Sequence, residues 1–462
     1  MTRDLPAGYP RPGWGRIASR GIPRSDDCRR RRPHRVVARV VPSDDSGRRG
    51  RRTLPLCEPV GRPGVILDTA PLDYDPRDPA TQRDPYPVYH RLREEDPVHR
   101  ASLGFWALSR FEDVFEAALD GTTFSSAQGL TFADNEIAAL GLKPTLVMMD
   151  RPQHTTFRRL ISRGFTPRKV AEFEPLIRAF VRGRVAILAD AGEADFIEVL
   201  AGPLPTLVVA TYLGVPESDR AQFDSWSNAI VQANASNGIV SDAPEAVAGL
   251  YAYFTELVDF RRKHPGDDML SDLVAANVDG HPLHLDEILG YCFVMIAGGN
   301  DTATGLLGGA AVELTEHPAQ RAVLLDDPAL LAGAIEELLR ITSPVQGLSR
   351  TATRDVTLHG VTIEAGTKVH LLYGSANRDR HEFGPTADEL DVTRSIRRML
   401  AFGNGPHRCI GATAARLQAR VALQELFRVV PDFTVDGSRG RLAPGPFVRR
   451  YESLPVTAGR TG

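Results

Sequence analysis

The segment that most constrains this chain is "AFGNGPHRCIG", which runs from Ala401 to Gly411. It holds three glycines, one proline and one cysteine, and "ATAARLQARVALQELF", a segment with helical apolar periodicity, follows it. Cys409 therefore lies where a loop meets a helix, and the free amides and dipole of a helix N-terminus stabilise a thiolate. Taken alone, a buried and inert thiol is the competing interpretation, because free cysteine is among the most buried residue types.

The neighbours of Cys409 favour a ligand role. Gly403 and Gly405 allow the backbone to approach a bulky group, and Phe402 offers a packing surface. Such a loop suits an axial thiolate ligand of haem iron. The pattern FGxGxHxCxG is matched at every fixed position up to Gly411, and the segment resembles the haem-binding loop of the cytochrome P-450 family. The resemblance implies that Cys409 ligates the iron of haem b and that Phe402, Gly403 and Gly411 contact this cofactor.

A pair of charged residues in "AIEELLR" carries a second part of the resemblance. Glu337 and Arg340 are three residues apart on a helix, where a solvated surface pair is the default interpretation. The pair is similar to the family's ExxR motif. The resemblance implies a buried salt bridge that also involves an arginine before the haem loop, and Arg394 in "DVTR" is the candidate. These three residues would give structural support to the haem loop.

The segment "VMIAGGNDTATG" lies in a long apolar stretch with helical periodicity, roughly residues 286–315. Polar Asn300, Asp301 and Thr302 are costly in such a helix unless their hydrogen bonds are satisfied. The segment is similar to the family's [AG]GxDT motif. The resemblance implies that the helix opens there to admit dioxygen and water, and that Asp301 and Thr302 are catalytic residues that manage protons.

Histidine and arginine side chains match the family's contacts to the haem propionates. His154 and Arg158 in "DRPQHTTFRR" are four residues apart and share a helix face, for which exposure to solvent is the default. Their spacing resembles the family's HxxxR. Arg350 in "GLSRTATR" and His407 match two further contacts, and the planar guanidinium is suited to carboxylates. The chain departs from the family's usual NRDP pattern by carrying Arg380.

Periodicity predicts a mainly α protein with small β-sheets, an α+β class. Helices are expected within residues 84–99, from Phe111, and after Thr166 as N-cap, with one apolar face up to Phe180. Short strands are expected around the turn at Gly104 and within residues 355–373. The resemblance implies the single-domain cytochrome P-450 fold over residues 65–462, with haem between a long central helix and the cysteine-bearing loop.

Residues 1–64 differ in character from the rest. The first 60 residues hold 15 arginines, no lysine and six acidic residues, a net charge of +9 against −3 for the whole chain. They lack apolar periodicity, so we expect a disordered extension. A basic arm that binds nucleic acid without specificity, or an upstream start codon that the cell does not use, is the alternative.

Composition places the chain among soluble proteins. It is 42% hydrophobic and has four scattered cysteines, which favours a reducing compartment, and its most apolar region contains Asn300 and Asp301. We therefore expect a cytoplasmic protein without a membrane anchor or a specific nucleic-acid partner, and a monomer.

The resemblance implies a monooxygenase that inserts one atom of dioxygen into a small to medium lipophilic molecule, as in secondary metabolism. About 50 residues follow Cys409, too few for a reductase domain, so electrons from NAD(P)H are expected through a separate ferredoxin and its reductase. We expect this donor to dock on a basic patch of Arg394, Arg397, Arg398, Arg408 and Arg416. The substrate pocket is expected from the loop after Phe124, the residues around 223–240, the central helix and "SPVQGLS", with Asn234, Asn237 and Gln346 as polar groups.

Three other functions remain open from the residues. A haem sensor or isomerase would not need the Asp301–Thr302 pair, and a peroxide-driven enzyme typically lacks it. A cysteine hydrolase could pair Cys409 with His407, but residues two apart at a loop–helix junction point in different directions.

Overall fold

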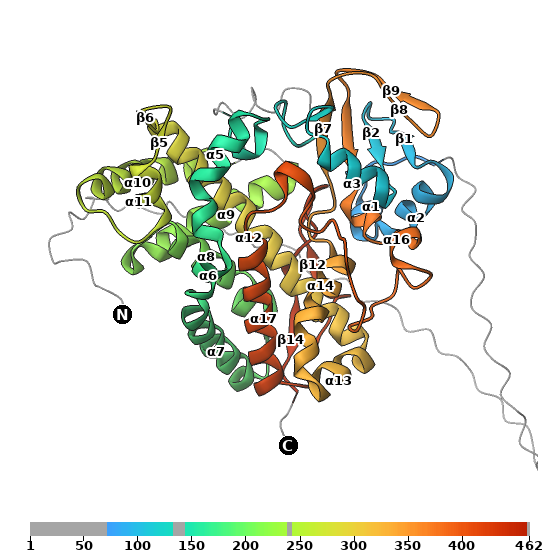
Figure 1. Cartoon of the computed structure of the whole chain (residues 1–462). Coiled ribbons are helices and arrows are strands. Elements are labelled where there is room, and N and C mark those ends of the chain that lie inside the picture. The colour runs from blue at the N-terminus through green and yellow to red at the C-terminus, as the bar shows by residue number, and fades with distance from the viewer. Residues whose placement is uncertain (1–71, 133–143, 238–242, 460–462) are drawn as a thin grey trace, which may run out of the picture. The chain divides into compact units, whose positions relative to one another are not determined.

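Helices form most of the molecule, as predicted, and the computed structural model describes residues 72–132, 144–237 and 243–459 (Figure 1). All of these residues belong to one unit. The Arg-rich extension predicted at residues 1–64 lies outside the described residues. The helices are α1 Pro79–Arg83, α2 Tyr86–Glu95, α3 Phe111–Leu119, α5 Gln153–Ser162, α6 Pro167–Ala171, α7 Glu174–Ala191, α8 Pro203–Tyr212, α9 Arg220–Asn237, α10 Pro244–Lys263, α11 Met269–Ala275, α12 Leu285–Glu316, α13 Pro318–Asp326, α14 Leu331–Thr342, α15 Tyr373–Ala376, α16 Arg380–Phe383 and α17 Ala412–Val429.

Helix α12 is the central element, and its bounds agree with the predicted segment 286–315 to within one residue at each end. A capping box formed by His284 and Glu287 fixes its start. Helices α8, α9, α14 and α17 pack against it (Figure 1). Because α12 is surrounded in this way, most of its side chains are buried, which explains its nearly continuous apolar sequence.

The strands form small sheets. Within the described residues, a five-stranded sheet has the order β1 Val98–Arg100, β2 Trp106–Leu108, β10 Lys368–Leu371, β7 Leu348–Ala352 and β3 Phe124–Ser125. A three-stranded sheet joins β11 Thr434–Val435, β14 Pro455–Thr457 and β4 Glu193–Asp195. The two-stranded pairs are β5 Asn277–Val278 with β6 His281–Pro282, β8 Val356–Leu358 with β9 Val361–Ile363, and β12 Arg441–Leu442 with β13 Tyr451–Ser453.

The predicted strand pair around Gly104 is present as β1 and β2, and Gly104 adopts a positive φ of 92° in the turn. Thr166 caps α6 by accepting a hydrogen bond from the amide of Lys169. The single helix expected up to Phe180 is wrong, because the chain ends one helix at Ala171 and begins α7 at Glu174. Pro175 occupies the first turn of α7, a position that proline favours, whereas inside a continuous helix it would clash with the preceding turn.

None of the helices in the described part of the chain is long and apolar enough to cross a membrane.

Candidate functional site

A cavity of about 420 Å³ lies against α12 and against the loop of residues 401–411, here called the Cys409 loop. Its wall is mainly apolar, with contributions from α5, α8, α12, β7 and α17 and from the segments that lead into them. Residues near the C-terminus that the sequence did not point to, Phe447 and Val448, also line it. The sequence-predicted residues that line the cavity are His154, Arg158, Thr302, Arg350, Phe402, Gly403, His407, Cys409 and Gly411.

Cys409 lies between the short turn Gly405–His407 and the start of α17. Its amide donates a hydrogen bond of 2.8 Å to the carbonyl of Phe402, which closes the loop. Cys409 is exposed, and its exposed surface lines the cavity. Burial within the protein raises the pKa of its thiol, while the amide of Gly411 and nearby arginines, including Arg158, lower it. The thiol is therefore presented to the cavity, and an iron ion there would be the strongest stabiliser of the thiolate.

The glycines of this loop differ in role: Gly403 and Gly411 line the cavity, whereas Gly405 does not. Gly405 has a φ of +66°, and a Cβ added there would lie 2.6 Å from the carbonyl oxygen of Ala118 at the end of α3. Gly403 also adopts a positive φ, of 63°, but a Cβ there would meet only the hydroxyl of Tyr373 at 3.8 Å. The expectation that Gly405 makes room for a bulky group is therefore wrong, because this glycine permits close packing of the loop against α3.

Four nitrogen-bearing side chains converge on the cavity from three segments. His154 and Arg158 come from α5, Arg350 from β7, and His407 from the Cys409 loop. The rings of His154 and His407 have centroids 4.1 Å apart. Arg158 donates a hydrogen bond of 2.5 Å to the carbonyl of Arg408, and Arg350 donates one of 2.7 Å to the carbonyl of Ser349.

This donor cluster lacks an acidic partner within the part of the chain that is described. His154 is buried, and its Nε2 has no hydrogen-bond partner there. Burial is the main cause that lowers the pKa of His407 to about 3, and the charge of Arg350 adds to it. Burial and, to a smaller extent, the charge of Arg158 lower the pKa of His154. Clustered donors and cations of this kind favour an anionic ligand, so the residues fit a group with carboxylates at its edge and a metal near Cys409, as haem has.

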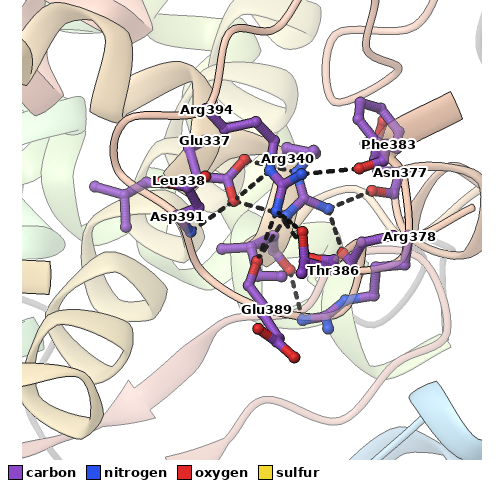
Figure 2. A network of polar contacts seen from close by, with 12 residues as sticks. Glu337, Leu338, Arg340, Asn377, Arg378, Phe383, Thr386, Glu389, Asp391 and Arg394 are labelled. Atoms are coloured by element: carbon purple, nitrogen blue, oxygen red, sulfur yellow. Dashed lines mark hydrogen bonds and ion pairs between the residues drawn. The ribbon is translucent and has the colours of Figure 1, made fainter. Parts of the chain in front are cut away.

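The predicted charged pair lies in a buried ion-pair cluster (Figure 2). The side chains of Glu337 and Arg340 are both fully buried and make two contacts of 2.7 Å, which excludes a solvated surface pair. Arg394 lies 3.2 Å from Glu337 and completes the cluster. Each guanidinium also donates hydrogen bonds to backbone carbonyls: Arg340 to those of Asn377, Ala387 and Glu389, and Arg394 to those of Phe383 and Thr386.

This cluster connects α14 to the chain that leads into the Cys409 loop (Figure 2). Asn377 has two further contacts: its Oδ1 accepts a hydrogen bond from the amide of Leu400, and its Nδ2 donates one to the hydroxyl of Ser343. Since Leu400 precedes the loop directly, the ion pair on α14 fixes the position at which the loop begins.

Adjacent residues of α12 face different surroundings. Thr302 lines the cavity, and its hydroxyl donates a hydrogen bond of 2.9 Å to the carbonyl of Gly298. Asp301 is buried, does not line the cavity and forms an ion pair with Arg450. Burial raises the pKa of Asp301 to about 6, although Arg450 lowers it. Helix α12 runs without a break through these residues.

Sequence reasoning missed Arg450. It lies 149 positions after Asp301, and no local pattern connects the two residues. Unlike the ExxR pair, their proximity depends on the path of the last strands, which a single sequence does not reveal.

Two expectations about polar substrate contacts have different outcomes. Gln346 does not line the cavity, because its amide bonds to the carbonyl of Ser343 at 2.7 Å. The side chains of Asn234 and Asn237 lie outside the described residues. No described residue of α9 lines the cavity, whereas residues after Phe124 and within "SPVQGLS" do.

The basic patch is smaller than the sequence suggested. Arg394 belongs to the Glu337 cluster, Arg398 pairs with Glu382 and Glu112, and Arg416 pairs with Glu336. Arg397 and Arg408 are exposed and make no ion pair within the described ranges. The departure at Arg380 lies on the surface, where this residue pairs with Glu94 at 2.7 Å.

Comparison with known proteins identifies the relatives of the chain. The family model described as Cytochrome P-450 matches residues 241–436. A protein of Mycobacterium tuberculosis named cytochrome P-450 130 is 52% identical over 385 residues, which cover 81% of this chain and 95% of that protein. A vitamin D(3) 25-hydroxylase of Pseudonocardia autotrophica is 36% identical over 386 residues, which cover 82% of this chain and 94% of that protein.

Solved structures show the same fold. A cytochrome P-450 of Chondromyces apiculatus aligns with a TM-score of 0.76 and 34% identity, covering 84% of this chain and 98% of the other. A cytochrome P-450 of Mycobacterium marinum in complex with pseudoionone aligns with a TM-score of 0.76 and 32% identity, covering 84% of this chain and all of the other.

The substitution Glu337→Gln tests the structural role of the buried cluster. It leaves Arg340 and Arg394 without a counter-charge in the interior, and breaking a buried pair in this way costs about 3–5 kcal/mol. Glu336→Gln is the matched control, because Glu336 is the neighbouring residue and pairs with Arg416, and these two side chains are 28% and 30% exposed. Solvent screens such a pair, so its loss should cost less, about 1 kcal/mol. Urea unfolding of both variants measures the difference. Equal losses of stability would contradict the role assigned to Glu337.

Proposed function

Because the chain belongs to the cytochrome P-450 family, we propose that it oxygenates a small to medium lipophilic molecule with electrons from NAD(P)H, delivered through a separate ferredoxin and reductase. The family consists of haem-thiolate monooxygenases. The observation that carries the proposal is that Cys409 and Thr302 line one largely apolar cavity. A thiolate ligand, a hydroxyl and space for an apolar molecule are thus available together.

The residues around the cavity have separable roles in this proposal. Cys409 would ligate the iron of haem b, and His154, Arg158, Arg350 and His407 would bind its propionates. When bound, haem supplies the activation of dioxygen. The protein supplies the orientation of the substrate, the exclusion of water and the control of protons.

In this proposal, residues of α12 control the delivery of protons. The hydroxyl of Thr302 is oriented by the carbonyl of Gly298, so its oxygen remains able to accept a hydrogen bond from a water or ligand in the cavity. Asp301 is the nearest acid along the helix, and a pKa of about 6 suits an acid that gains and loses protons near neutral pH. We assign the catalytic proton path to these two residues.

The apolar wall supports a lipophilic substrate. Leu146, Phe293, Leu306 and Val448 line the cavity without offering a hydrogen bond from their side chains. One relative is named for the hydroxylation of vitamin D(3), and one solved neighbour holds pseudoionone. Terpenoids, steroids, fatty acids and polyketides all fit this chemistry. We also propose that the protein is a cytoplasmic monomer.

The proposed reaction is tested by isotope labelling. Spectral titration of the ferric protein with a chemically broad library first identifies a ligand that displaces water from the iron. Turnover of this ligand with NAD(P)H, a ferredoxin and its reductase under oxygen-18 gas should give a product with one labelled oxygen atom. An oxygenated product without the label, whose oxygen then comes from water, or hydrogen peroxide alone with every ligand of the library, would contradict the proposal.

The substitution Thr302→Ala removes the hydroxyl from the cavity. We expect several-fold more hydrogen peroxide per NAD(P)H consumed and correspondingly less product, because proton delivery is no longer controlled. Thr304→Ala is the matched control: its hydroxyl bonds to the carbonyl of Ala201 and does not line the cavity. Unchanged coupling of NAD(P)H use to product in Thr302→Ala would refute the role of this hydroxyl.

The substitution Arg397→Glu tests ferredoxin docking. Arg397 is exposed, so reversing its charge should slow ferredoxin-driven turnover several-fold and make it less sensitive to salt, while peroxide-driven turnover stays unchanged. Lys263→Glu makes the same charge change on α10 and should leave both rates unaltered. Equal loss of ferredoxin-driven and peroxide-driven turnover in Arg397→Glu would contradict the docking of ferredoxin at this residue.

A further inference from the structure

One side of the Cys409 loop lies against helix α3. The Nδ2 of Asn404 donates a hydrogen bond of 3.2 Å to the carbonyl of Phe115, in the second half of that helix. The next residue, Gly405, packs directly on the last turn of the helix, where an added Cβ would lie 2.6 Å from a carbonyl oxygen. Two successive residues of the loop therefore contact α3, one through its side chain and one through its backbone.

Phe115 is also contacted by a residue that precedes the loop. The guanidinium carbon of Arg398 lies 5.0 Å from the ring centres of both Phe111 and Phe115. Its nitrogen atoms pair with Glu112 at 3.1 Å and with Glu382 at 2.5 Å. A guanidinium over aromatic faces and beside carboxylates is attracted to both. The chain before the loop and the loop itself are thus fastened to the same part of α3.

Helix α3 is itself held in place. The amide of Phe111 donates a hydrogen bond of 2.9 Å to the carboxylate of Asp379, which is buried. The side chains of Phe111 and Val114 belong to the same hydrophobic cluster as Leu400, the residue directly before the loop. Because close-packed side chains resist displacement, α3 provides a rigid support for the loop.

Asn404 lies within the part of the loop that determines the position of Cys409. The amide of Cys409 donates a hydrogen bond of 2.8 Å to the carbonyl of Phe402, which closes a ring of residues that contains Asn404. Inside this ring, the amide of Arg408 donates one of 3.1 Å to the carbonyl of Gly405. These two bonds leave the short segment little freedom, so a displacement of Asn404 is passed on to Cys409.

We propose that Asn404 is a positioning residue that fastens the Cys409 loop to α3 and thereby keeps the Cys409 thiolate in place for haem iron. The inference rests on the haem ligation in the proposed function. The support that it adds is distinct from the Glu337 cluster: that cluster holds the chain at the start of the loop, whereas Asn404 holds the middle of the loop.

A positioning role differs from a merely structural one in what a substitution changes. The hydrogen bond of Asn404 joins neutral groups that are only partly buried, so its loss should cost little of the overall stability. The effect should be local, in the residues between Asn404 and Cys409. Faster hydrogen exchange of these amides and a less persistent iron–thiolate bond are its two measurable consequences.

Hydrogen exchange of the ferric holoenzyme, read by mass spectrometry, tests the fastening. Asn404→Asp keeps the size of the side chain but replaces the N–H donor with an oxygen that faces a carbonyl. We expect the amides of residues 405–409 to exchange about fivefold faster, the factor for one ordinary hydrogen bond, while peptides from α12 and α14 are unchanged. Asn404→His should restore slow exchange, because its Nδ1–H lies as many bonds from the backbone as the amide Nδ2 of asparagine.

The reduced carbon monoxide complex tests the consequence for Cys409. In urea below the unfolding transition, the red-shifted Soret band should decay about fivefold faster in Asn404→Asp than in the wild type, for the same reason. Far-ultraviolet circular dichroism confirms that each variant stays folded. Asn277→Asp, the same change at an exposed asparagine of β5, should alter neither the exchange nor the decay. If Asn404→Asp does not fold, Asn404→Ala replaces it.

Unchanged exchange of residues 405–409 in a folded variant would overturn the proposal. Exchange that accelerates equally in all peptides, or a faster-exchanging loop with an unchanged decay of the band, would overturn it as well. A wild-type holoenzyme without the red-shifted band counts against the proposed function, and the exchange experiment then still decides whether Asn404 fastens the loop. A wild type with this band and an unchanged decay in Asn404→Asp counts against Asn404 alone.

Discussion

The buried ion pair of Glu337 with Arg340 is the interaction on which the site depends. Charges in an interior are unfavourable unless they are paired and hydrogen-bonded, and here Arg394 and several backbone carbonyls satisfy the remaining groups. These carbonyls belong to the chain between α15 and the Cys409 loop. This segment cannot shift without removing hydrogen-bond partners from the buried guanidinium of Arg340. The position of Cys409 is therefore determined by α14, a helix that lies well before it in the sequence.

Helix α12 separates two environments that the reaction would use differently. One face, with Thr302, borders an apolar cavity, and another, with Asp301, contacts Arg450 just before β13. The nitrogen donors are gathered near His154 and His407, so an anionic group is favoured at one part of the cavity and an apolar molecule at the rest. This division supports a cofactor with charged edges beside a lipophilic substrate.

Local signals in the sequence predicted the features that local interactions determine. The length of α12, the cap at Thr166 and the turn at Gly104 follow from periodicity, capping and turn chemistry. Pro175 was also a local signal, since it marks the first turn of α7. The prediction nevertheless extended one apolar helix face across this proline. Features that depend on tertiary contacts were misjudged or missed: Gly405 packs against α3, several arginines of the expected patch are held in ion pairs, and Arg450 reaches Asp301.

The central claim is that Cys409 provides the thiolate ligand of a haem held in this cavity. The reduced carbon monoxide complex tests it most directly, because a red-shifted Soret band requires haem with a thiolate ligand. We predict this band in the wild type and in Cys292→Ser, whose cysteine is buried away from the cavity, and its loss in Cys409→Ser. A colourless wild-type protein, or an unchanged band in Cys409→Ser, would contradict the account.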